Sequence, residues 1–182
     1  MIRRHSIAVL ALSLIPALVL AQQSPVAEEF RARAKLSAKN LMDAANAMPP
    51  DKYSYKPTPP QLSFADIVVH VAQANDFLCG AIGGVKAPTR SEIGVTDSKD
   101  ALVARLRETF QFCDLALATL DDSKLTEQLP MTAWTMARRE SGGTTMSRIA
   151  VQFKTVADWA GHSARMASYL RSNNILPPAA NK

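Results

Sequence analysis

Apolar residues recur at intervals of three and four in four stretches of the chain, and proline or glycine residues separate these stretches. This spacing gathers the apolar side chains on one face of an α-helix. The chain has only seven glycines, and most of its prolines are clustered, which favours helices over a turn-rich β fold. The predicted helices run from about Val26 to Met48, from near Leu62 to Gly83, from about Lys99 to Leu120, and from near Thr145 to about Ser172.

Polar residues mark the expected starts of the second and third helices. Ser63 is followed three residues later by Asp66, which is the spacing of a capping box. Asp97 or Ser98 can cap the third helix in the same way.

The connections between the helices differ in character. Tyr53 and Tyr55 lie in a connector that is too rich in proline for a helix, and we expect these tyrosines to pack across the end of the bundle. The segment from Asp121 to Gly143 is polar and interrupted by Pro130, although Trp134 suggests that part of it is packed. We therefore predict no long helix in that segment.

Four amphipathic helices of similar length predict an all-α fold, a four-helix bundle. The loop of some sixteen residues after the second helix could span about 50 Å, whereas that helix is about 30 Å long. The loop can therefore carry the chain back along the bundle, so that the second and third helices run parallel. This arrangement gives the helix order up-down-down-up.

Two cysteines, Cys79 and Cys113, bear on this order. In parallel helices they lie at similar depths, whereas in an antiparallel hairpin they would differ by about 16 Å along the axis. A disulfide needs α-carbons within about 7 Å. A bond between them would therefore favour the up-down-down-up order, and two buried free thiols remain the alternative.

The N-terminal residues have the pattern of a secretory signal peptide. Arg3 and Arg4 precede an apolar stretch from Ile7 to Leu20, and cleavage after Ala21 is expected. We therefore predict a signal peptide over residues 1–21 and a single bundle domain over residues 22–182, secreted or periplasmic, with no stable membrane anchor after cleavage. An uncleaved N-terminal anchor is the alternative, although the stretch is short for a membrane span.

Composition narrows the classes of function. The chain of 182 residues is 47% hydrophobic and 20% charged, which fits one globular domain and excludes general disorder. The formal net charge is +5, and the basic residues are scattered with few aromatics among them. We therefore expect no nucleic-acid partner.

Three residues are candidate metal ligands. His70 and His162 are the only histidines after residue 21, and each lies in the middle of a predicted helix. Asp158 precedes His162 by four residues, so both side chains project from one helix face. If the last helix runs antiparallel to the second, then His70, Asp158 and His162 lie at similar heights along the axis of the bundle. Three protein ligands with one open position are typical of a catalytic site for zinc, nickel or ferrous iron.

A second interpretation of the same residues needs no metal. Asp158 and His162 could form an ion pair within the helix, and His70 could be a core histidine with its hydrogen bonds satisfied. The apolar neighbours Ile67 and Ala74 indicate that His70 faces inward. Spacing alone does not decide between the two interpretations.

Three stretches of the chain have a familiar order and spacing. They are Met48–Pro57 followed by Ser63–Phe64 and the helix with His70, then His162 followed by Tyr169–Leu170–Arg171, and finally Asn174–Pro178. In these stretches the chain resembles the DinB-like (damage-inducible protein DinB) family. The resemblance implies an up-down-down-up bundle with a metal site.

The resemblance also implies a ligand set, usually three histidines. His70 and His162 match the first and last of these ligands, and Asp158 stands at the position of the middle one. Aspartate can bind a metal, so the site either persists with a different charge or has been lost.

Activities known in the family imply a metal-dependent hydrolase or a thiol-dependent transferase that acts on an unknown small-molecule substrate. Export would separate the protein from cytosolic thiols, which favours hydrolysis. The alternatives are a non-catalytic metal- or ligand-binding helical bundle of the cell envelope and a purely structural bundle. No catalytic residue is identified, Tyr169 could line the pocket or pack in the core, and a homodimer is expected to form through an exposed helix face.

Overall fold

The computed structural model describes residues 24–131 and 144–178, and its dominant elements are four long helices packed as a bundle. The prediction of an all-α four-helix bundle is confirmed. The predicted signal peptide lies outside the described residues, as does Trp134. The elements are α1 (Pro25–Ala47), a 3-10 turn (Pro50–Lys52), α2 (Phe64–Gly83), α3 (Lys99–Leu117), a second 3-10 turn (Asp122–Lys124), strands β1 (Gln128–Pro130) and β2 (Thr145–Ser147), and α5 (Arg148–Ser172).

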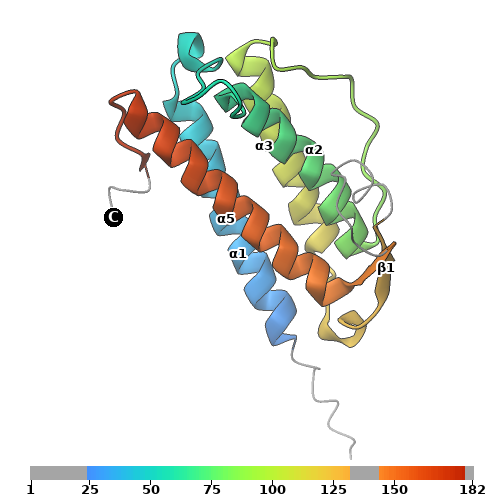
Figure 1. The fold of residues 1–182 in the computed structure, drawn as a ribbon. Coiled ribbons are helices and arrows are strands. Elements are labelled where there is room, and N and C mark those ends of the chain that lie inside the picture. Colours follow the sequence, from blue (N-terminus) through green and yellow to red (C-terminus); the bar gives the residue numbers. More distant parts are fainter. Residues whose placement is uncertain (1–23, 132–143, 179–182) are drawn as a thin grey trace, which may run out of the picture.

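The helices follow the up-down-down-up order (Figure 1). At one end of the bundle, Lys99 Nζ at the start of α3 donates to the carbonyl of Asn46 at the end of α1. At the other end, the guanidinium of Arg31 in α1 donates to the carbonyl of Leu120, just after α3. Helix α3 is therefore antiparallel to α1. The loop after α2 returns the chain along the side of the bundle, so α2 and α3 run parallel (Figure 1).

A disulfide joins the two parallel helices near their C-terminal ends. Cys79 of α2 and Cys113 of α3 are bonded, their α-carbons are 5.1 Å apart, and both residues are buried. This is the pairing that the parallel arrangement of the two helices allows. The described part of the chain therefore contains no free thiol.

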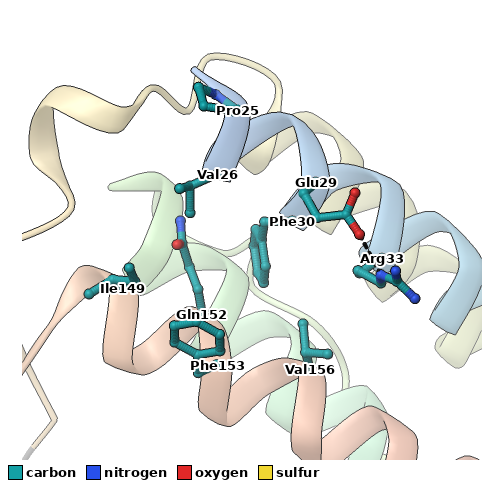
Figure 2. Close-up of a pocket in the computed structure, with 9 residues that line it drawn as sticks. All are labelled: Pro25, Val26, Glu29, Phe30, Arg33, Ile149, Gln152, Phe153 and Val156. Atoms are coloured by element: carbon teal, nitrogen blue, oxygen red, sulfur yellow. Dashed lines mark hydrogen bonds and ion pairs between the residues drawn. The ribbon is translucent and has the colours of Figure 1, made fainter. Parts of the chain in front are cut away.

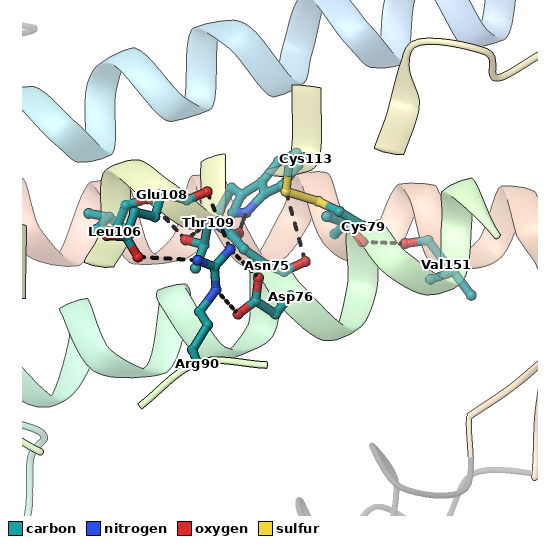
Figure 3. Close-up of a disulfide and its surroundings, with 11 residues drawn as sticks. Asn75, Asp76, Cys79, Arg90, Leu106, Glu108, Thr109, Cys113 and Val151 are labelled. Atoms are coloured by element: carbon teal, nitrogen blue, oxygen red, sulfur yellow. Dashed lines mark hydrogen bonds and ion pairs between the residues drawn. A yellow bond between two sulfur atoms is a disulfide. The ribbon is translucent and has the colours of Figure 1, made fainter. Parts of the chain in front are cut away.

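An ion-pair group lies beside the disulfide and attaches the returning loop (Figure 3). Arg90 of the loop donates to both carboxylate oxygens of Asp76 in α2, at 2.8 and 3.2 Å, and to Glu108 of α3 at 3.1 Å. Only 16% of the Arg90 side chain is exposed. Because a bidentate guanidinium–carboxylate pair has a defined geometry, Arg90 holds the loop against both helices.

A polar centre connects three helices in the core. Asn75 of α2 accepts a hydrogen bond from the indole nitrogen of Trp159 in α5 at 2.8 Å. Its side-chain nitrogen donates to the hydroxyl of Thr109 in α3 at 3.2 Å. Trp159 is fully buried, with its ring against Phe30 and Phe110. These contacts set the register of α5 on α2, which matters for the site described below.

The tyrosines of the proline-rich connector pack at the end of the bundle, as predicted. The hydroxyl of Tyr53 donates to the carbonyl of Ala45 at 2.6 Å, and the Tyr53 ring meets Phe64 edge to face. Burial raises the pKa of the Tyr53 hydroxyl. The ring of Tyr55 contacts Tyr169 in the same edge-to-face manner.

The start of the last helix differs from the prediction. Residues Thr145–Ser147 form strand β2, which pairs antiparallel with β1, and α5 begins at Arg148 rather than near Thr145. The hydroxyl of Ser147 accepts a hydrogen bond from the amide of Ala150 and caps the helix. Hydrogen bonding to β1 holds these residues in a strand instead of in the first turn of the helix. The helical periodicity of the sequence does not reveal this pairing. Helix α3 likewise ends at Leu117, three residues earlier than predicted.

The predicted capping box at the start of α2 is present. The hydroxyl of Ser63 accepts from the amide of Asp66, and the Asp66 carboxylate accepts from the Ser63 amide at 2.8 Å and from its hydroxyl at 2.6 Å. These hydrogen bonds, chiefly the one from the hydroxyl, lower the pKa of the Asp66 carboxyl below its ordinary value.

We expect Asp66→Asn to lower the free energy of unfolding at neutral pH by about 0.5–1 kcal/mol, the usual size of a helix cap. Because the pKa of Asp66 is depressed in the folded protein, its contribution is present above the unfolded pKa and is lost as the pH falls through the folded pKa. Urea denaturation at pH 7 and at pH 3 should therefore show the deficit of the variant shrinking at the lower pH. An equal deficit at both pH values would contradict this account.

No helix in the described ranges has both the length and the apolarity that crossing a bilayer requires.

Candidate functional site

The three predicted ligands converge where α2 faces α5. His70 comes from α2, and Asp158 and His162 come from α5. Each offers one nitrogen or oxygen, and these atoms lie within 4.8 Å of one another. His162 Nε2 is 3.5 Å from Asp158 Oδ1, and His70 Nε2 is 4.0 Å from Asp158 Oδ2. The centres of the two imidazole rings are 4.9 Å apart.

The register of the two helices explains this convergence. Helix α5 is antiparallel to α2, with Tyr169 near the start of α2 and Trp159 opposite Asn75 near its middle. His70 lies between these two levels on α2. It therefore comes opposite the turn of α5 that carries Asp158 and His162, which are one helical turn apart on the same face.

The cluster is shielded on one side and open on the other. The exposed fractions of the His162 and Asp158 side chains are 9% and 12%, whereas that of His70 is 31%. The prediction that His70 faces inward is therefore only partly right, because α2 places it at the edge of the interface with α5 and not on the core face. From this edge the imidazole reaches a cavity.

The cavity has a volume of about 490 Å³. Its wall includes small residues on α5, Ala157 and Gly161, beside the two ligand positions on that helix. The guanidinium of Arg165 and the apolar side chain of Leu62 complete the wall. The lining residues are Leu62, His70, Ala157, Asp158, Gly161, His162 and Arg165. All three candidate ligands therefore border this cavity.

The donor set suits a divalent transition metal. Two imidazoles and one carboxylate are ligands of zinc, nickel and ferrous iron. Donors about 2.1 Å from a tetrahedral ion lie about 3.4 Å apart, so the 3.5 and 4.0 Å separations need only small side-chain rotations to close.

One imidazole retains unused hydrogen-bonding capacity. His162 Nδ1 is buried and has no hydrogen-bond partner among the described residues. Such groups are rare in folded proteins because their desolvation is costly. An imidazole that the protein satisfied fully, as the metal-free interpretation requires of a core histidine, would have both nitrogens engaged. His162 Nδ1 does not meet this requirement, although the nitrogen that faces Asp158 is Nε2, so the observation concerns the metal-free interpretation alone.

Tyr169, left open between two roles by the sequence, does not line the cavity. It is buried, and its hydroxyl donates to the carbonyl of Leu62 at 2.9 Å. Burial is the main reason that the pKa of this hydroxyl is raised. Tyr169 therefore holds the chain before α2 against α5 and supports the wall of the cavity at Leu62.

Arg165 is a lining residue that sequence reasoning did not single out. It follows Asp158 by seven residues and His162 by three, so all three share one face of α5. This spacing was visible in the sequence. The presence of a cavity on that face was not, because Leu62 and His70, which form the opposite wall, depend on tertiary packing.

A second cavity, of about 550 Å³, lies between the N-terminal halves of α1 and α5 (Figure 2). Its lining is mainly apolar, including Val26, Phe30 and Phe153, and Phe153 is 70% exposed. The amide of Gln152 points from α5 toward Val26 among these apolar side chains (Figure 2). Gln152 is only 3% exposed, and neither polar atom of its side chain has a hydrogen-bond partner in the described structure.

Comparisons with known proteins agree with the architecture. The family model described as the DinB superfamily matches residues 33–164, which include all three candidate ligands. The crystal structure of a conserved protein from Enterococcus faecalis is similar to this chain, with a TM-score of 0.61 and 13% sequence identity. The similarity covers 80% of this chain and 95% of that one, and at this identity it shows a shared fold. No protein in the curated set matches.

Proposed function

The chain belongs to the DinB superfamily, and on this premise we propose that it binds one divalent metal ion through His70, Asp158 and His162 and acts with it on a small molecule. The observation that carries the proposal is the convergence of three donors from two helices within 4.8 Å, beside a cavity. Because Asp158 is one of these converging donors, the geometry supports a metal site that is retained, with a changed charge, when aspartate occupies the middle ligand position.

The three residues divide the work of holding the ion. Asp158 would supply the negative charge that two neutral imidazoles lack, and its place one turn before His162 would hold that ring in position. His70, the most exposed of the three, would close the site from α2 and face the cavity. A zinc, nickel or ferrous ion bound there supplies Lewis acidity to an exchangeable fourth ligand.

Hydrolysis is the reaction class that we favour over transfer to a thiol. The disulfide between Cys79 and Cys113 is of the kind that persists in oxidising compartments. Together with the predicted signal peptide, it supports export, which would remove the protein from cytosolic thiol cofactors. The cavity of about 490 Å³ supports a small substrate and not a polymer.

Elemental analysis of the protein, purified without chelator or histidine tag, tests the metal site. We expect about one equivalent of zinc, nickel or iron per chain. The loaded and metal-stripped forms should then be compared in parallel screens of ester, amide and phosphoester hydrolysis and of thiol transfer. Metal-dependent turnover of a thiol acceptor without hydrolysis would overturn the favoured reaction class, and failure to take up any of these metals would overturn the site.

One feature favours the second candidate function, a non-catalytic ligand-binding bundle. The groove between α1 and α5 exposes apolar side chains around the unpaired Gln152 amide, so it suits a small apolar ligand with one hydrogen-bonding end. The fluorescence of an anilinonaphthalene sulfonate probe, compared between the wild type and Phe153→Ser, tests it. Equal enhancement in both proteins would argue against binding in this groove.

The buried amide also predicts a stability effect. Since Gln152 forms no hydrogen bond in the described structure, we expect Gln152→Leu to raise the free energy of unfolding by about 1–2 kcal/mol, the cost of an unsatisfied buried polar group. Urea denaturation in the absence of ligands measures this. A loss of stability would show that the amide has a partner in solution.

A further inference from the structure

Arg165 is the one arginine or lysine among the residues that line the cavity at the His70–Asp158–His162 cluster. It makes no hydrogen bond or ion pair with any residue in the described ranges. By contrast, Arg90 and Arg148 pair with carboxylates, and Arg31 donates to backbone carbonyls. The guanidinium of Arg165 is therefore available to a molecule in the cavity.

The geometry of α5 directs this guanidinium over open space. Side chains on a helix lean toward its N-terminus, so Arg165 extends back over the turn that contains Gly161 and His162. A β-carbon added at Gly161 would meet no atom within 4 Å. Ala157, one turn earlier, is also small. Together Ala157, Gly161 and Arg165 form one row along α5, next to the row formed by Asp158 and His162.

The charges in the cavity favour an anion. A bound divalent ion contributes +2, Asp158 contributes −1 and Arg165 contributes +1, so the loaded site carries a net charge of +2. Leu62, Ala157 and Gly161 add no charge to the lining. A positive field in a concave site concentrates anionic ligands. A single guanidinium with planar, paired donors matches a carboxylate in a bidentate arrangement.

We propose that the cavity selects small molecules with a carboxylate a few bonds from the atom that reaches the metal site, and that Arg165 binds this carboxylate above Gly161. The inference rests on the proposed metal site and specifies its substrate class. Arg165 is a binding residue in this arrangement, and it determines specificity without holding the metal.

Two ligands of nearly the same shape test the proposal. Succinate has two carboxylates, whereas succinamate has one carboxylate and one neutral amide. Their dissociation constants would be measured at constant ionic strength on the cobalt-loaded protein, from changes in its visible absorption. We expect succinate to bind roughly five- to tenfold more tightly than succinamate. This ratio is the usual contribution of one ion pair, here between a carboxylate and the Arg165 guanidinium, at a position that solvent reaches.

Substitutions locate this preference. Arg165→Gln is expected to reduce it to less than about twofold while leaving cobalt stoichiometry unchanged, because a neutral amide replaces the charge. Arg171→Gln, at an exposed position in the last turn of the same helix and outside the cavity lining, should keep the full preference. Gly161→Leu should weaken the binding of both ligands because it fills the space beneath Arg165.

Each other outcome has a distinct meaning. Equal binding of the two ligands by the wild type, or an undiminished preference in Arg165→Gln, would overturn the assignment of Arg165. Unchanged binding in Gly161→Leu would overturn the placement of the ligand. A wild type that takes up no cobalt would remove the proposed metal site itself, and the inference with it.

Discussion

Replacement of His162 by alanine is expected to reduce bound divalent metal from about one equivalent to a level not measurable by elemental analysis. The reason is geometric. His162 is the most buried of the three candidate ligands, and its Nε2 lies 3.5 Å from Asp158 Oδ1. Without it, Asp158 and His70 would remain as two donors from different helices, which is too few to hold an ion against water. His70→Ala should have the same effect from the other side.

Two further variants make this prediction specific. Asp158→Asn preserves the shape of the side chain but removes its charge, so we expect it to weaken metal binding without abolishing it. Gln73→Ala changes an exposed residue one turn from His70 on α2 and should keep the full equivalent. Urea denaturation of each protein would confirm that the substituted chains are folded. Full metal content in a folded His162→Ala variant would disprove the proposed ligand set.

Removal of the disulfide is expected to lower the free energy of unfolding by about 4 kcal/mol, which is a large part of the stability of an ordinary domain. Cys79 and Cys113 are separated by 34 residues, and a link across this separation restricts the unfolded chain strongly. The segment between them contains the long loop and most of α3. Its release would therefore increase the freedom of the unfolded state more than that of the folded bundle.

The measurement is urea denaturation of the double variant Cys79→Ala/Cys113→Ala against the oxidised wild type. Both cysteines are buried, so alanine also leaves a small cavity, and the Cys79→Ser/Cys113→Ser variant provides a comparison of similar volume. A loss of less than about 1 kcal/mol in both variants would contradict a large contribution from the cross-link. It would point to the Arg90 ion pairs as the main attachment of the loop.

The two predictions concern separable parts of the molecule. The three candidate ligands come from α2 and α5, whose register is set by the hydrogen bonds from Trp159 to Asn75 and from Tyr169 to Leu62. The disulfide instead joins α2 to α3. We therefore expect the cysteine variants to retain about one equivalent of metal under conditions where they remain folded.

Local signals in the sequence predicted the helices well where a polar residue marked their start. Ser63 and Asp66 form the capping box that their spacing indicated, and Ser98 caps α3. The start of α5 was predicted too early because Thr145–Ser147 pair with β1, and strand partners that are distant along the chain leave no mark on helical periodicity. Helix propensity depends on neighbouring residues in the sequence, whereas strand pairing depends on which distant segments the tertiary structure brings together.

The sequence by itself determined the four-helix pattern, the identity of the three candidate ligands and the spacing that puts Asp158 and His162 on one helix face. It also allowed the up-down-down-up order through the length of one loop, although it left the cysteine pairing open. Only the tertiary structure decided that pairing, the partial exposure of His70, and the cavity that makes Arg165 a candidate binding residue. The physical reason is that periodicity specifies a face of each helix, whereas the depth of a side chain and the space before it depend on the rotation and register of the neighbouring helix.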